Sequence, residues 1–213
     1  TFRFRQAIRA GNAVVPVSVQ FSGTVDEPHA FVTVPANTPE PLRREAARAV
    51  AHMINAKADL TAFYRHFAGD DRLERLFHRL RGAKIPLDPD PFECLAKTII
   101  SQQISLTFAG TLMRRLTERW GSVVWFDGEP LPAFPDAGTI ARLTPDDLRP
   151  LSFSAPKAEY LIGAARAAAD GAIDWKRIGE LDDDEAVAAL TGLRGIGRWT
   201  AECLLIFAYG RTD

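Results

Sequence analysis

The chain of 213 residues is long enough for one large domain or two small ones. Hydrophobic residues make up 46% of it and charged residues 25%, which is typical of a soluble globular protein. The sequence has no run of about 18 apolar residues, so it predicts no membrane-spanning helix. No secretory signal pattern opens it, and we expect a cytoplasmic protein.

The formal net charge is −1, and residues 92–213 carry 13 Lys and Arg against 17 Asp and Glu. This balance argues against nucleic-acid binding by bulk counterion release, but it permits a site of oriented main-chain amides and a few arginines. The two cysteines, Cys94 and Cys203, are too few for an iron–sulfur cluster or a four-ligand zinc site. They are typical of buried thiols in a reducing compartment.

Residues 1–66 predict a small α/β domain. Apolar side chains recur at helical spacing over residues 42–54 and indicate an amphipathic helix. A small antiparallel sheet with this helix across one face would bury both patterns. Period-two alternation predicts its three strands, near residues 2–4, 15–21 and 30–34.

Residues 67–91 predict a helical segment of a discontinuous helical domain. The wider stretch 59–81 reads as two short helices, and a turn over residues 82–91 leads into the next domain. This domain covers residues 92–213, in which we expect helices and no strand. The predicted fold class is therefore α+β, a small N-terminal sheet with a helix followed by an all-α domain.

Two predicted helices flank a polar loop at residues 101–105, with the sequence Ser-Gln-Gln-Ile-Ser. The first helix begins with Asp90 as its N-cap and Pro91 at its first position. Ser105 caps the second, which we expect to bury Phe108 on its apolar face. Two glutamines between helices fit a solvated linker as well as a functional loop.

The segment from Leu190 to Ala201 carries the most specific pattern, Leu-Thr-Gly-Leu-Arg-Gly-Ile-Gly-Arg-Trp-Thr-Ala. A short helix that starts after Asp182 precedes the glycines, and a second helix starts near Arg198. The glycines permit a tight turn whose main-chain N–H groups converge where a phosphate would be stabilised. Such a turn also serves as a plain connection in many proteins. Followed by Trp-Thr-Ala, however, it resembles the helix-hairpin-helix DNA-binding motif.

Together these pieces resemble the DNA-3-methyladenine glycosylase II family of the helix-hairpin-helix DNA glycosylase superfamily. The resemblance covers the strand-rich beginning, the helix pair with its Ser-Gln-Gln-Ile-Ser loop, the helix start at residues 154–157 and the hairpin. Such enzymes flip a damaged base out of the duplex and hydrolyse its N-glycosidic bond. The resemblance implies base excision repair of alkylated bases such as 3-methyladenine, with double-stranded DNA as the partner of a monomeric enzyme.

The resemblance also implies roles for individual residues. The hairpin amides would hold a DNA phosphate, helped by Na⁺ or K⁺ on the main-chain carbonyls of Thr191, Leu193 and Ile196. The polar loop would enter the minor groove and fill the gap left by the flipped base, with Gln103 or Ile104 as the plug. The implied DNA contacts are Gln103, Ile104, Ser105, Gly195, Ile196, Gly197, Arg198 and Thr200, and the implied base pocket is Trp199, Gln102 and Cys203.

Trp199 stands where strand-cutting members of the superfamily have a lysine that forms a Schiff base. We therefore expect a monofunctional hydrolase that needs no cofactor for its chemistry. The indole suits a positively charged methylated purine, although a core aromatic would fit the same pattern. The family's catalytic aspartate follows the second hairpin helix, and Asp213 matches a residue several positions before it. We therefore expect no catalytic residue within the chain and a core that is truncated at its C-terminal end.

Two departures from the family pattern leave alternatives open. Arg194 replaces a usual proline, and Cys203 replaces an aromatic residue of one branch, which leaves the substrate range open. A non-catalytic helix-hairpin-helix DNA-binding protein, a glycosylase for another base lesion and a helical scaffold without nucleic acid are the competing interpretations.

Overall fold

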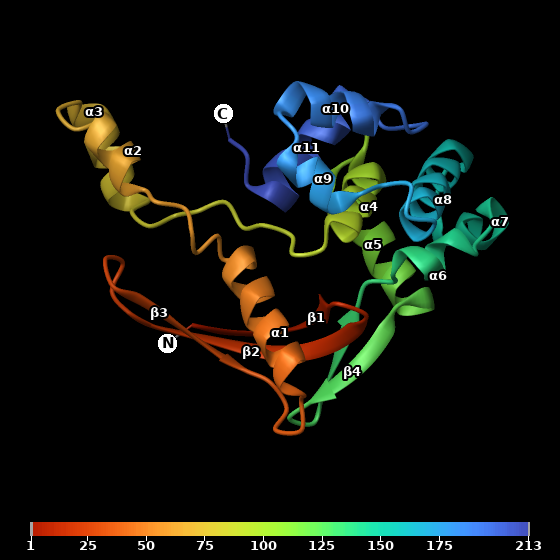
Figure 1. The fold of residues 1–213 in the computed structure, drawn as a ribbon, viewed down its shortest axis with the longest axis horizontal. Coiled ribbons are helices and arrows are strands. Elements are labelled where there is room, and N and C mark those ends of the chain that lie inside the picture. Colours follow the sequence, from red (N-terminus) through yellow and green to blue (C-terminus); the bar gives the residue numbers. More distant parts are fainter. Residues whose placement is uncertain (1, 213) are drawn as a thin grey trace.

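A computed structural model describes residues 2–212 of the chain. The fold is α+β, as the sequence predicts: an N-terminal antiparallel sheet with one helix precedes a largely helical domain (Figure 1). The long segment after α3 connects the two parts. Among the described residues, no helix has both the length and the apolar character needed to cross a membrane.

The N-terminal sheet has the strand order β1-β2-β3 and is antiparallel throughout. Its register pairs Ile8 with Val15 and Val19 with Val32. Helix α1 crosses one face and buries Val50 against these side chains, which completes a small apolar core. The elements are β1 Arg3–Ala10, β2 Ala13–Gly23, β3 Pro28–Thr33 and α1 Glu40–Met53.

Strands β4 (Ser122–Phe126) and β5 (Glu129–Ala133) form a second, two-stranded sheet. The expectation that residues 92–213 contain no strand is therefore wrong. Asp127 and Gly128 between the strands have φ of 51° and 79°, the positive values of a type I′ hairpin turn. The β4–β5 hairpin packs on the N-terminal sheet. Burial of that sheet's second face therefore favours strands at residues 122–133. An Asp-Gly pair between apolar runs was the sequence signal for it.

Helices α2 (Thr61–His66) and α3 (Asp71–Arg79) project from the rest of the molecule (Figure 1). They contact each other through aromatic side chains, with 4.8 Å between the ring centroids of Phe63 and Phe77. The expected boundary directly after residue 66 therefore falls inside a pair of helices that pack together.

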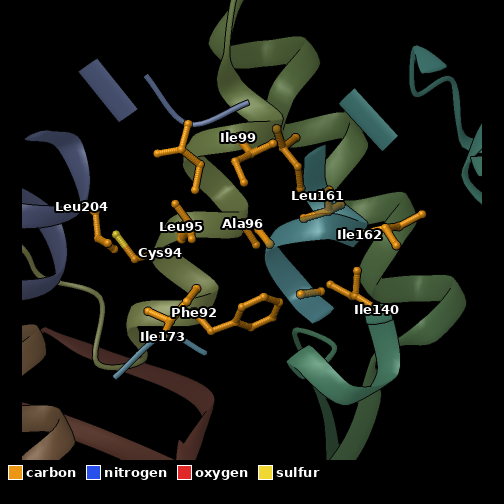
Figure 2. Packing of buried hydrophobic residues seen from close by; sticks show 14 of the residues in the cluster. Phe92, Cys94, Leu95, Ala96, Ile99, Ile140, Leu161, Ile162, Ile173 and Leu204 are labelled. Carbon is orange, nitrogen blue, oxygen red and sulfur yellow. The ribbon is translucent and has the colours of Figure 1, made fainter. Parts of the chain in front are cut away.

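A continuous apolar core joins the helices that follow residue 90. Helix α4 lies at its centre, where Leu95 and Ile99 are fully buried between Leu161 and Leu204 of two other helices (Figure 2). The helices are α4 Pro91–Ser101, α5 Leu106–Trp120, α6 Ala137–Ala141, α7 Pro145–Leu148, α8 Ala155–Ala169, α9 Trp175–Glu180, α10 Asp183–Thr191 and α11 Arg198–Tyr209, with a 3-10 turn at Arg149–Leu151.

Helix α5 buries a narrower stripe than its sequence predicts. Ala109, Leu112 and Leu116 are its fully buried residues. Phe108 was expected in the core but is 40% exposed, because it lies at the edge of this stripe.

Candidate nucleic-acid interface

Helices α10 and α11 form a hairpin around a tight turn at residues 192–197, as predicted. Gly195 has φ of 86°, and a Cβ at this position would lie 2.1 Å from Cγ of Tyr160. Only glycine fits this close approach and this backbone conformation. Ile196 is 4% exposed and anchors the turn in the helical core, so it has only main-chain atoms to offer a ligand.

The N-terminus of α11 is open. Its N-cap, Gly197, has no side chain, whereas a carboxylate caps α10. The first described helical hydrogen bond runs from the Ala201 N–H to the Gly197 carbonyl, at 3.1 Å. The N–H groups of Arg198, Trp199 and Thr200 precede this bond and form the positive end of the helix dipole. Such an arrangement binds anions such as phosphate.

Gln102 connects the polar loop to this hairpin. Its side-chain Nε2 donates to the Gly195 carbonyl at 3.0 Å and to Oγ1 of Thr200 at 2.9 Å. Both amide hydrogens are therefore used inside the protein, and only the amide oxygen has acceptor capacity for a base. Thr200 is 2% exposed and its hydroxyl accepts from Gln102, so its side chain does not face solvent.

The loop between α4 and α5 exposes one glutamine. Gln103 has φ of 57° and an exposed side chain. Ile104 is partly buried against the helical core, and Ser105 accepts a hydrogen bond from the Phe108 N–H at 3.3 Å as the cap of α5. Of the two candidate plugs, Gln103 is therefore the exposed one.

Lys157, in the first turn of α8, contacts the start of the α4–α5 loop. Its Nζ donates to the carbonyls of Ile99, Ile100 and Gln102 at 3.0, 2.8 and 2.9 Å. Burial lowers the pKa of this half-buried lysine. These carbonyls end α4, where a cation is favoured by the helix dipole.

The two exposed arginines of the hairpin both have acidic partners. Arg198 donates to Glu202 at 2.7 Å, and this hydrogen bond raises the pKa of Arg198, which stays cationic. Arg194 lies 3.2 Å from Glu159 and over the ring of Tyr160. These acidic partners partly neutralise both guanidinium groups, which fits the mildly acidic charge balance of the domain. The main-chain amides at the start of α11 are therefore the main anion-attracting groups of the hairpin.

Trp199 has an indole that is 56% exposed. Among the described residues, Trp199 is therefore not part of the apolar core of the helical domain. Cys203 follows one turn later on α11 and is partly buried, and burial raises the pKa of its thiol, which is therefore neutral at pH 7. Asp213, which is expected to match a family residue several positions before the catalytic aspartate, lies outside the described residues.

The main-chain carbonyls of Thr191, Leu193 and Ile196 surround the hairpin turn and are neutral oxygen donors of the kind that a monovalent cation accepts. Thr191 is the last residue of α10, at the negative end of its dipole. The Leu193 carbonyl accepts the Ile196 N–H at 3.1 Å, which leaves one lone pair for an ion. Within residues 2–212, no cluster of His, Cys, Asp and Glu could hold a multivalent metal.

Sequence reasoning missed several residues around these loops. Lys157 and Tyr160 support the two loops from α8, and Leu106, the first residue of α5, is 84% exposed. For Lys157, the available sequence signal was a lysine in the first turn of an alanine-rich helix. Leu106 precedes the buried stripe of α5, but the sequence pattern did not show that it is exposed.

Residues 96–211, more than half of the chain, match the family described as HhH-GPD superfamily base excision DNA repair protein. A DNA-3-methyladenine glycosylase of Bacillus subtilis is 33% identical over 77% of this chain and 54% of its own length. A second protein of that organism, YfjP, is 31% identical over 96% of this chain and 68% of its own length. The structure of a 3-methyladenine DNA-glycosylase from Archaeoglobus fulgidus has a TM-score of 0.83 at 27% identity, covering 98% of this chain and 69% of that one. The chain thus spans about half to two thirds of these relatives, and it belongs to the HhH-GPD superfamily of base excision DNA repair proteins.

Proposed function

We propose that the protein is a monofunctional DNA glycosylase that flips alkylated bases such as 3-methyladenine out of double-stranded DNA and hydrolyses their N-glycosidic bond. The observation that carries this proposal is the exposed indole of Trp199, one residue beyond the open N-terminus of α11. An indole beside a phosphate-binding turn can face a base whose backbone that turn holds.

The indole also favours one class of base. A methylated purine such as 3-methyladenine is positively charged, and a cation is attracted to the negative face of an aromatic ring. Trp199 has no amine, so the hairpin cannot form a Schiff base at this position, and hydrolysis by water follows. Because the alkylated base is already a good leaving group, the pocket has to position the base more than activate it.

Three further assignments complete the proposal. The amides at Gly195, Gly197 and the start of α11 hold a phosphate, and a Na⁺ or K⁺ ion on the carbonyls of Thr191, Leu193 and Ile196 supports this turn. Gln102 and Cys203 line the base pocket with an amide oxygen and a neutral thiol. Gln103 fills the gap in the stack, and the enzyme acts as a monomer.

The test is release of radiolabelled methyl bases from methylated duplex DNA, by the protein expressed from its complete gene. We expect release of 3-methyladenine without strand cleavage, and no release from a duplex that carries an oxidised guanine. Trp199→Ala should lower kcat/KM about tenfold to a hundredfold, since stacking on an aromatic ring contributes about 1–3 kcal/mol per base. Thermal stability should be unchanged, because the indole is exposed.

Each other outcome excludes a part of the proposal. Duplex binding without release of any base would indicate a non-catalytic DNA-binding protein. Release of an oxidised base alone would indicate a glycosylase for another lesion. Full activity of Trp199→Ala would refute the role of the indole.

A further inference from the structure

Lys157 donates hydrogen bonds to the last carbonyls of α4 and to the peptide group directly before Gln103. We propose that Lys157 is a positioning residue that fixes the loop that carries Gln103 in the orientation needed to enter the DNA stack. The inference rests on the proposed function, because it assumes that the loop fills the gap left by a flipped base. Lys157 itself is half-buried and is assigned no contact with DNA.

All three N–H groups of the Lys157 ammonium are used at the end of α4. They donate to the carbonyls of Ile99, Ile100 and Gln102 at 3.0, 2.8 and 2.9 Å. The last carbonyls of a helix have no partner within the helix, so a single cation satisfies several of them together. The hydrogen bonds continue one residue past the helix, to the peptide group that directly precedes Gln103.

This peptide group sets the direction of Gln103. The Gln102 carbonyl points to Lys157. The Gln103 N–H lies on the opposite side of the same trans peptide bond, so it points away from the lysine. Gln103 has φ of 57°, a left-handed conformation that is unfavourable for a residue with a side chain. Without the lysine, the loop would gain stability by leaving this conformation. The exposed side chain of Gln103 would then no longer be held in one orientation.

The same face of α8 also supports the hairpin. The ring of Tyr160, three residues after Lys157, closely approaches Gly195 in the turn. On the far side of the loop, the Gln102 side chain donates to the Gly195 carbonyl. The first turns of α8 therefore contact both DNA-facing segments, and one rigid helix sets the separation between the phosphate-binding turn and the plug.

The experiment uses a duplex with a tetrahydrofuran abasic-site analogue opposite 2-aminopurine, whose fluorescence rises when the plug unstacks it. An intact duplex of the same sequence measures binding by the hairpin alone. Lys157→Met keeps the length of the side chain and removes its donors, while Lys157→Arg keeps the charge and donors. Lys176→Met is the matched control, since the Lys176 side chain is 87% exposed on α9.

We expect Lys157→Met to lose most of the fluorescence response. Its preference for the abasic over the intact duplex should fall about tenfold. Binding to the intact duplex should change by less than about twofold, because the hairpin amides are retained. Lys157→Arg should restore part of the response, and Lys176→Met should match the wild type. A merely structural role would lower both affinities together with the midpoint of thermal unfolding.

Lys157→Gln is measured in parallel, in case the methionine variant does not fold. It keeps two donors on a shorter side chain, so its response should lie between those of the methionine variant and the wild type. A wild-type response from either folded variant overturns the inference. If the wild-type protein itself shows no preference for the abasic duplex, the inference fails. The proposed function fails separately, if no methylated base is released.

Discussion

Gly197→Asp tests the amide site at the start of α11 most directly. Gly197 has φ of −93° and ψ of 175°, close to the φ of −68° and ψ of 171° of Asp182, the N-cap of α10. The Asp182 carboxylate accepts the Glu185 N–H at 2.8 Å. An aspartate at position 197 should therefore bond the equivalent amide of α11 and occupy the site proposed for phosphate. No heavy atom lies within 4 Å of a Cβ built there, so the substitution needs no repacking.

The expected effects on folding and on DNA binding have opposite signs. The new cap and its attraction to the helix dipole should raise the free energy of unfolding by about 0.5–1 kcal/mol. Loss of one charge-assisted hydrogen bond to phosphate removes about 1.5–3 kcal/mol of binding free energy, and repulsion by the carboxylate adds to this loss. The dissociation constant for duplex DNA should therefore rise at least about tenfold.

The assay combines urea denaturation with fluorescence anisotropy of a labelled duplex at fixed salt. Gly197→Ala is the matched control, because it keeps the amides free and should cost about 1 kcal/mol or less as a poorer N-cap. Gly197→Ser should lie between the aspartate variant and the wild type, since it caps the helix without a charge. Wild-type affinity in a folded Gly197→Asp protein would refute the assignment of these amides to phosphate.

Two further changes test the supports of the site, and a third tests the cap of α7, which lies outside it. Gly195→Ala should lower the free energy of unfolding by about 2–4 kcal/mol, because positive φ and overlap with the Tyr160 ring both disfavour a Cβ; a loss below about 1 kcal/mol in urea denaturation would contradict the packing. Gln102→Ala should cost about 1–3 kcal/mol in the same measurement, since it leaves a buried hydroxyl and a carbonyl without their donor. Hydrogen bonds from Thr144 lower the pKa of Asp147 below its ordinary 3.8, so this carboxylate stabilises the fold above that pH and the stabilisation is lost as pH falls through the folded-state value. Asp147→Asn should therefore flatten the decline of thermal stability in acid, and equal slopes for both proteins would exclude this contribution.

Local sequence patterns predicted the elements that carry the site. The spacing of apolar residues and the glycines located the hairpin, and α11 begins at Arg198 as expected. Asp90 and Ser105 cap α4 and α5 as predicted, because these caps depend on groups a few residues apart. The Asp-Gly turn at residues 127–128 was an equally local signal that the helical interpretation overlooked.

The sequence by itself determined the family, the element order around the hairpin and the absence of a lysine at Trp199, because all of these are properties of neighbouring residues. Only the tertiary structure decided that the indole of Trp199 and the side chain of Gln103 are exposed. It alone showed that Lys157 and Gln102 join segments that are 55 and 93 residues apart in the chain. Such contacts depend on how helices pack around a shared core, and no local pattern of residues specifies that packing.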